Sequence, residues 1–317
     1  MSLSAKENYL AALRFADPEY VPRGEENVFF AFQFEGNFVQ GNWTDLWGVR
    51  WEVGLPDTVP FPKGNPLPSL DRLGDYRFPR PEQLVFTEEL RAQVAAVDRG
   101  RRLLLGQLTY LLFERAWAVM GMEEFLTALL THPAEAHAFL HAIADYARGV
   151  FDRYLELGVD GISFSEDLGS QRALLLSPAL FREFLLPEYT HCFAPSLRAG
   201  KIVYFHSCGC VDAIAGDLAA LGVTVLNPIQ ARANDLRRLK ADTVGRMALE
   251  GGIDTSVLAL GTPADVRAEV ARVLEVLMPG GGYVCAPDQH LPGVPEENMQ
   301  ALWETARALG RYHGGAA

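Results

Sequence analysis

The sequence predicts an α/β protein built as a single (β/α)8 TIM-type barrel. From residue 82 onwards, short apolar runs of strand length alternate with longer helical segments, which is the pattern of a parallel sheet. No phosphate-binding glycine fingerprint follows the first strand, so a dinucleotide-binding fold is not supported. No flexible linker or internal repeat divides the chain, and we therefore expect one barrel domain over residues 1–317.

The expected elements follow from hydrophobic periodicity and from turn residues. Expected strands are 28–34, 102–106, 161–165, 201–205, 223–226, 246–249 and 283–285. Expected helices are 4–15, 82–98, 120–130, 133–157, one that begins at 177, 211–221, 233–241, 262–278 and 295–311. Ser177 and Thr262 are expected N-cap residues, because each precedes a proline at the first helical position.

Residues 36–81 break this alternation. Prolines stand at positions 56, 60, 62, 66, 68, 79 and 81, a density that excludes long helices and central strands. We therefore expect an irregular lid packed over one end of the barrel. Trp43, Trp47 and Trp51 would form one aromatic stripe on a helix, although the alternation from Val49 to Val53 also allows a strand.

Composition and charge limit the class of partner. The chain carries 28 basic and 40 acidic residues, a formal net charge of −12, so a nucleic acid is not expected as a partner. No apolar stretch approaches the roughly 20 residues that span a bilayer, and Met1 to Lys6 contains no apolar signal core. A cytoplasmic protein without a membrane partner is the expectation.

A His-x-Cys pair follows an apolar strand. His206 and Cys208 are two residues apart, so on extended backbone both side chains point to the same face, and Gly209 lets the chain turn past them. A second cysteine, Cys285, also ends a strand, and the carboxyl ends of barrel strands meet at one rim. Three nitrogen and sulfur ligands with one open position describe a catalytic zinc site. Cys210 is an alternative to Cys285 as the third ligand.

The alternative for each of these residues is a structural role. A lone cysteine at a strand end is more often a small core residue, and we assign Cys192, in an apolar helical stretch, to the core. His206 alone could equally be a polar side chain with its hydrogen bonds satisfied.

Five segments resemble the uroporphyrinogen decarboxylase-like superfamily, and more closely its cobalamin-dependent (corrinoid:thiol) methyltransferase branch. They are FHSCG at 205–209, GYVCAPD at 282–288, VPEEN at 294–298, DGISFSEDLG at 160–169 and WGVRWE at 47–52. The resemblance implies a (β/α)8 barrel and, from the methyltransferase branch, zinc held by His206, Cys208 and Cys285. It also implies a corrinoid, on a partner protein or free, as the methyl carrier.

The implied function is methyl transfer between a corrinoid and a small-molecule thiol activated on zinc. Glu166 is the expected fourth ligand or catalytic carboxylate, with Asp167 and Glu250 as weaker candidates, because barrel strand ends point into the site. Asp288 is an expected catalytic residue that could orient a ligand, as His290 could. Asn227, Gln230 and Asp167 are expected to bind substrate.

Three other functions remain open. A porphyrinogen carboxy-lyase of heme biosynthesis would need clustered cations, and the stretch after Pro22 and Arg23 supplies Glu25 and Glu26 instead. A non-catalytic corrinoid-binding barrel would bind zinc without methylating a thiol. A zinc hydrolase is disfavoured, because two thiolate ligands would make a zinc-bound water less acidic than three histidine ligands would.

Overall fold

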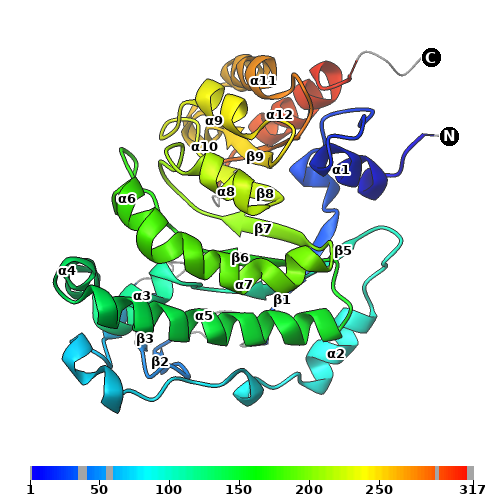
Figure 1. The fold of residues 1–317 in the computed structure, drawn as a ribbon. Coiled ribbons are helices and arrows are strands. Elements are labelled where there is room, and N and C mark those ends of the chain that lie inside the picture. The colour runs from blue at the N-terminus through cyan, green and yellow to red at the C-terminus, as the bar shows by residue number, and fades with distance from the viewer. Residues whose placement is uncertain (1, 35–40, 55–59, 290–292, 313–317) are drawn as a thin grey trace.

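In the described part of the chain, seven parallel strands form one curled sheet at the centre of the protein (Figure 1). The structure is a computed structural model and describes residues 2–34, 41–54, 60–289 and 293–312. The strand order is β1-β5-β6-β7-β8-β9-β10. The strands are β1 Phe29–Phe32, β5 Leu103–Leu108, β6 Gly161–Ser165, β7 Ile202–His206, β8 Val225–Ile229, β9 Ala248–Ile253 and β10 Tyr283–Pro287. The expected α/β class with a parallel sheet is confirmed.

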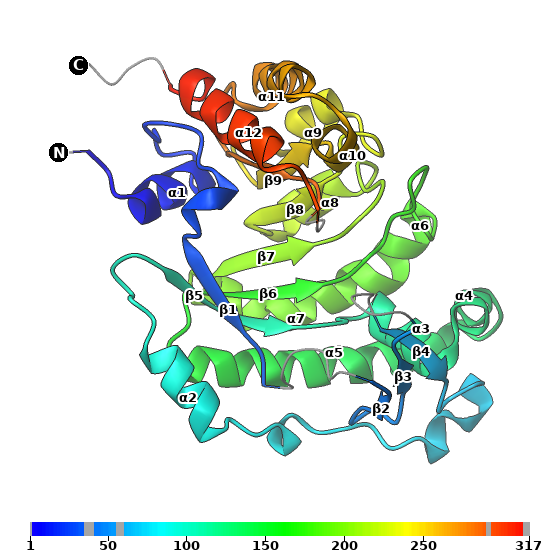
Figure 2. The ribbon, with the colours of Figure 1, turned by 180° about the vertical axis from the view of Figure 1, so that it is seen from behind.

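Helices surround the sheet, and most of them connect successive strands and cover its outer face (Figures 1 and 2). They are α1 Ala5–Leu13, α2 Glu88–Ala95, α3 Phe113–Met120, α4 Met122–Thr131, α5 Pro133–Glu156, α6 Pro178–Leu180, α7 Leu186–Arg198, α8 Ala215–Leu221, α9 Leu236–Thr243, α10 Thr255–Leu260, α11 Pro263–Leu277 and α12 Glu296–Leu309. The expected N-caps are confirmed, because Ser177 and Thr262 each accept a hydrogen bond from the first turn of the helix that follows.

Side-chain alternation divides the apolar residues of the sheet into two clusters. The smaller cluster fills the interior of the curled sheet with residues such as Leu105, Tyr204, Val225 and Val284. The larger cluster lies between the sheet and the covering helices and includes Tyr283 and Cys285. Neighbouring residues of β10 therefore face opposite sides, as the two-residue period of a strand requires.

The sheet closes less completely than an eight-stranded barrel. In the described residues, β1 and β10 are its two edges. The chain just before β1 contacts β10 through one parallel bridge between Arg23 and Cys285, where the Cys285 N–H donates to the Pro22 carbonyl at 2.8 Å. The eighth strand of the expected barrel is thus reduced to a single point of pairing.

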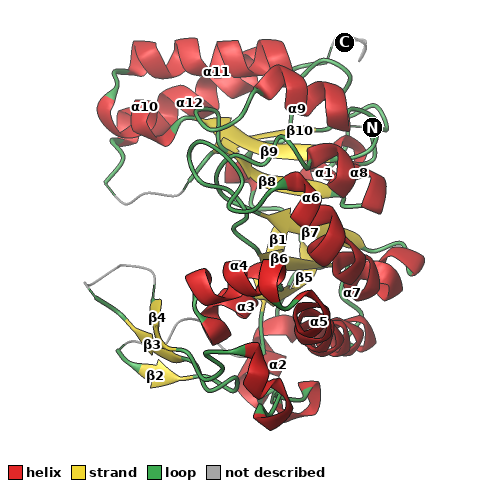
Figure 3. Cartoon of the chain, turned by 60° about the vertical axis from the view of Figure 1, so that its left-hand side comes forward, coloured by secondary structure: helices red, strands yellow, loops and turns green. Residues whose placement is uncertain are grey.

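The segment expected to be irregular contains a small sheet of its own (Figure 3). Strands β2 Trp43–Thr44, β3 Arg50–Glu52 and β4 Phe61–Gly64 pair antiparallel. Trp43 and Trp51 are cross-strand partners with stacked rings 6.0 Å apart, so the strand alternative for this stripe is correct and the helical one is wrong. Pro62 is accommodated because β4 is an edge strand.

A buried ion pair attaches this small sheet to the rest of the protein. Arg115 of α3 is 3% exposed and donates from Nη1 to Asp45 Oδ2 at 2.6 Å. Asp45 also accepts from the Trp51 indole at 2.9 Å and from the backbone N–H groups of Trp47 and Val49. One carboxylate therefore organises the turn between β2 and β3 and fixes it to α3.

Candidate metal centre

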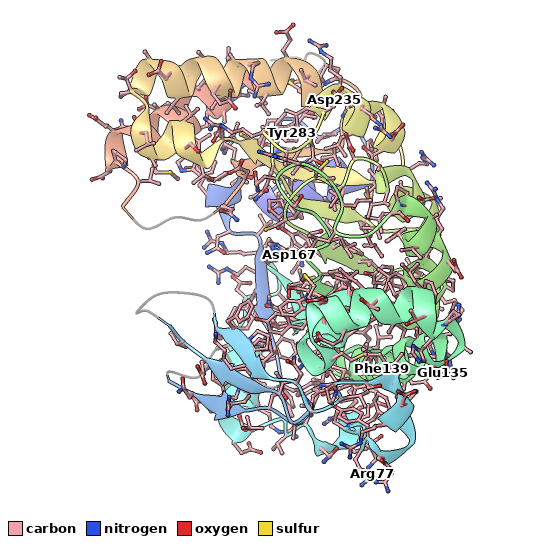
Figure 4. All side chains as sticks on the ribbon, turned by 90° about the vertical axis from the view of Figure 1, so that its left-hand side faces the viewer. Arg77, Glu135, Phe139, Asp167, Asp235 and Tyr283 are labelled. Carbon is pink, nitrogen blue, oxygen red and sulfur yellow. The ribbon has the colours of Figure 1, made fainter. Side chains whose placement is uncertain are left out.

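Three donor side chains converge at the carboxyl ends of β6 and β7. His206 is the last residue of β7, and Cys208 follows it by two residues. Ser165, the last residue of β6, is paired in register with His206, so Asp167 lies beside the same strand end. Figure 4 shows Asp167 at the middle of the molecule, between the part with α11 and α12 and the part with the small sheet. These strand ends place the side chains of Asp167, His206 and Cys208 at one rim.

The distances within this group suit a divalent metal. His206 Nε2 lies 3.7 Å from Cys208 Sγ and 3.8 Å from Asp167 Oδ1, and the three ligand atoms all lie within 4.8 Å of one another. Zinc bonds of about 2.0–2.3 Å at tetrahedral angles put two ligand atoms roughly 3.3–3.8 Å apart. The three donors therefore need to move only slightly to bind one ion. The side chains of His206 and Asp167 are 38% and 43% exposed, so a small molecule can reach them.

A hydrogen-bonded chain orients the His206 ring. Asn227 Oδ1 lies 3.0 Å from His206 Nδ1, and Asn227 Nδ2 donates to Glu250 Oε1 at 3.2 Å. Because Glu250 takes the amide N–H, the Asn227 oxygen faces the ring and assigns the proton to Nδ1. The lone pair on Nε2 then points toward Asp167 and Cys208. Metal-binding histidines are commonly fixed by such an outer partner.

Glu250 is itself held by two tyrosines. Tyr204 donates to its Oε1 at 2.8 Å and Tyr9 to its Oε2 at 3.1 Å. Burial raises the pKa of Glu250 from its usual 4.5 to about 7, although these hydrogen bonds act in the opposite direction.

The loop that carries Cys208 is tightly constrained. Gly209 has φ +83°, and a Cβ there would lie 2.2 Å from the Gly169 carbonyl oxygen, so only glycine fits. The Cys208 N–H donates to Asp167 Oδ1 at 2.8 Å and the Gly209 N–H donates to Gln230 Oε1 at 3.0 Å. Gln230, expected to bind substrate, is 5% exposed and also accepts from Gln171, so it supports this loop instead.

The electrostatics of the site favour a cation. Burial first, and then Asp167, raise the pKa of the Cys208 thiol to about 12, with Glu114 adding to the effect. Burial, with Asp167 and Glu166 nearby, raises the pKa of Glu114 to about 8. Glu114 is 7% exposed, and its Oε2 has no hydrogen-bond partner among the residues that the structure describes. A divalent cation would stabilise each of these groups in its anionic form, so the donor set fits a zinc ion.

The structure does not bring Cys285 to this group. Its side chain is fully buried on the helix-facing side of β10 with Tyr283, whereas the barrel interior receives Val284. The prediction that Cys285 completes the ligand set is therefore wrong for this structure. Gln289 instead reaches the pair, with Nε2 3.8 Å from Cys208 Sγ.

Two carboxylates expected to be catalytic instead hold helix ends. Glu166 is fully buried and accepts from the backbone N–H groups of Leu112, Phe113 and Glu114, and from the Tyr189 hydroxyl at 2.5 Å. It caps α3 and points away from the rim, so its expected ligand role is wrong.

Asp288 is the second of these carboxylates. Its Oδ1 accepts from the backbone and hydroxyl of Thr255, at the start of α10. It is 7% exposed and fixes a helix rather than a ligand. His290 lies outside the described residues.

The remaining candidate residues lie in different surroundings. Asp167, expected mainly as a substrate group, is one of the three convergent donors. Asn227 contacts His206 rather than open space. Cys210 lies beside Asp212, outside the group, and Cys192 is buried in α7 as expected. Glu114 was not predicted as a residue of the site. Its position could have indicated such a role, because it is an acid inside the apolar run that follows the strand ending near residue 108.

Fold and site together define an α/β barrel protein with an imidazole, a thiol and a carboxylate at the carboxyl rim of its sheet. Residues 113–309 match the family described as uroporphyrinogen decarboxylase (URO-D). This match covers more than half of the chain, which therefore belongs to that family.

Similar proteins carry two different activities. The chain is 28% identical over 204 residues to a uroporphyrinogen decarboxylase of Gloeobacter violaceus, which covers 61% of this chain and 56% of that protein. It is 29% identical over 191 residues to the methylcobamide:CoM methyltransferase MtaA of Methanosarcina barkeri, covering 59% of this chain and 49% of that protein. The chain thus spans about half the length of these relatives.

A solved structure supports the fold. The methyltransferase from Methanosarcina mazei matches 97% of this chain and 99% of its own, with a TM-score of 0.69 and 18% sequence identity. Among the described residues, no helix is both long enough and apolar enough to cross a membrane.

Proposed function

We propose that this protein is a zinc-dependent methyltransferase that moves a methyl group between a corrinoid and a thiol. The observation that carries the proposal is the convergence of Asp167, His206 and Cys208 at the rim. The similarity to a methylcobamide:CoM methyltransferase supports the choice of methyl carrier and acceptor class. The corrinoid, a corrinoid protein and the small-molecule thiol are parts of this proposal.

The ligand set differs from the one expected from the sequence, but its charge does not. A neutral imidazole, one thiolate and one carboxylate neutralise a divalent ion, as an imidazole and two thiolates would. When bound, zinc lowers the pKa of an incoming thiol and keeps the thiolate nucleophilic near neutral pH.

The residues around the ligands have separate tasks. Asn227 holds the proton of His206 on Nδ1 and leaves Nε2 free to bind. Asp167 accepts from the Cys208 N–H and so fixes the cysteine loop against the end of β6. Tyr110 stacks on Trp51 at 4.7 Å, and its N–H donates to Ser165, which brings the small sheet close to the rim, where it can shield a reacting methyl group from water.

Porphyrinogen decarboxylation is the second candidate, because several similar proteins carry that name. Such a substrate bears many carboxylates and needs unpaired cations around it. Arg23 is instead neutralised by Glu25 at 2.9 Å and by Glu26 at 2.7 Å. This observation favours the methyltransferase.

Metal content of purified variants tests the ligand set. We expect Cys208→Ala to lose about one zinc per chain relative to wild type, because one of three ligands is removed. Cys285→Ala is the matched control and keeps its zinc, since Cys285 faces the helices. Equal zinc in wild type and Cys208→Ala would reject the site.

Activity is tested separately with free methylcobalamin and a panel of small thiols. Demethylation of the cobalamin, seen in its visible spectrum, is expected with wild type and lost in Cys208→Ala. Zinc binding without thiol methylation would favour a non-catalytic corrinoid-binding barrel. Decarboxylation of a porphyrinogen by metal-free protein would favour the second candidate.

A further inference from the structure

A second group of metal-binding side chains lies on the outer face of the protein, away from the rim. His141 and Asp145 are one turn apart on α5, and His191 lies opposite them on α7. The ligand atoms of these three residues all lie within 4.8 Å of one another. The side chains of His141 and Asp145 are 53% and 60% exposed, and that of His191 is 27% exposed, so the group opens to solvent.

Asp145 lies between the two histidines. Its Oδ1 is 2.7 Å from His191 Nε2, and its Oδ2 is 3.8 Å from His141 Nε2. The two imidazole rings are 5.0 Å apart. Both Nε2 atoms therefore face one carboxylate, which is the arrangement that a shared ion requires.

Each ring is oriented through its other nitrogen. Glu188, which is 9% exposed, places Oε2 2.9 Å from His141 Nδ1. This carboxylate holds the His141 proton on Nδ1 and leaves Nε2 free, as in carboxylate–histidine–metal triads. Arg148 Nη1 lies 3.3 Å from His191 Nδ1, and a guanidinium can only donate, so in the metal-free protein Nδ1 of that ring accepts and Nε2 donates to Asp145. Binding of an ion at Nε2 therefore requires this proton to move to Nδ1 and Arg148 to move away from the ring.

We propose that His141, Asp145 and His191 form a second binding site for a divalent transition metal, with Glu188 positioning His141. Two imidazoles and one carboxylate suit zinc, and the remaining positions would be filled by water. The ion would cross-link α5 to α7, two helices that lie side by side on the outer face of the sheet (Figures 1 and 3). The site is independent of the proposed function at the rim.

The alternative to a metal site is a network of surface ion pairs. Such pairs stabilise proteins by about 0–1 kcal/mol and need no metal. The two alternatives differ in one measurable property, because only a metal site makes the stability of the protein depend on zinc concentration.

The experiment uses the full chain with Cys208→Ala, so that the rim site does not contribute, after treatment with a chelator. Zinc chloride alone is titrated in by calorimetry. We expect one zinc per chain with a Kd below about 0.1 mM. We also expect saturating zinc to raise the melting temperature by roughly 2–5 °C.

Variants in the same background assign the ligands. Adding His191→Ala, or separately His141→Ala, should abolish both the binding and the thermal shift. His137→Ala is the matched control, because His137 is an exposed histidine on α5 outside the group. Circular dichroism of the metal-free variants is used to check that they are folded. Binding weaker than about 0.1 mM in the starting protein, or unchanged binding in both ligand variants, would overturn the proposal.

Discussion

Glu250 should make the stability of the metal-free protein fall as the pH rises. Its pKa is about 7 in the folded protein against a usual 4.5, because the carboxyl is buried. Between these two values the unfolded chain has released the proton and the folded protein still holds it, so rising pH favours unfolding. The difference of 2.5 in pKa, at about 1.36 kcal/mol for each unit, corresponds to about 3 kcal/mol.

The variant Glu250→Gln removes this titration and keeps an acceptor oxygen for Tyr204. Urea unfolding of chelated wild type and variant is compared from pH 4.5 to pH 7.5, a range that spans both pKa values. We expect wild type to lose about 3 kcal/mol more than the variant over this range.

Glu166 and Glu114 also titrate from raised pKa values, of about 7 and about 8, so only the difference between the two proteins isolates Glu250. Glu183→Gln, at an exposed position on the turn that leads into α7, is the matched control and should follow wild type. Parallel curves for wild type and Glu250→Gln would refute the reasoning.

Three further perturbations test the scaffold of the site. Arg115→Met leaves the largely buried Asp45 without its cation and should cost about 2–4 kcal/mol in urea unfolding, and a loss below 1 kcal/mol would contradict the role given to this pair. Gly209→Ala places a Cβ against the backbone of Gly169 and should abolish zinc binding at the rim, measured as zinc per chain. Gly216→Ala is the control and should bind zinc as wild type does, because a Cβ there meets open space. Asn227→Ala should weaken zinc binding about 10–100-fold in a competition titration, because His206 loses its orienting partner, and unchanged affinity would show that the ring needs none.

The sequence predicts the elements of the large sheet well because their signals are local. Each strand is a short apolar run, and each helix start at Ser177 and Thr262 carries its own cap. The i, i+2 spacing of His206 and Cys208 likewise predicts their approach, and the structure places their ligand atoms 3.7 Å apart. Apart from the strand allowed by the alternation from Val49 to Val53, the small sheet was not predicted, because β2 and β4 are only two and four residues long.

The errors at the site share one physical cause, which is the phase of alternation along a strand. Tyr283, Val284, Cys285 and Ala286 are all apolar, so no change in polarity shows which of them face the barrel interior. Glu166 and Asp167 are adjacent acids, and only one of them can point toward the rim. Contacts with distant parts of the chain set the direction of both side chains. For Cys285 this contact is the bridge to Arg23, and for Glu166 it is the hydrogen bonds to the first turn of α3.

The first turn of α3 serves two parts of the molecule with consecutive residues. Glu114 belongs to the electrostatic surroundings of Cys208, and Arg115 holds Asp45 in the small sheet. A rotation of this one turn would change the charge near the thiol and the position of Trp51 and its neighbours together. The small sheet and the candidate metal centre are thus linked through two consecutive residues of α3, whose first turn is capped by Glu166.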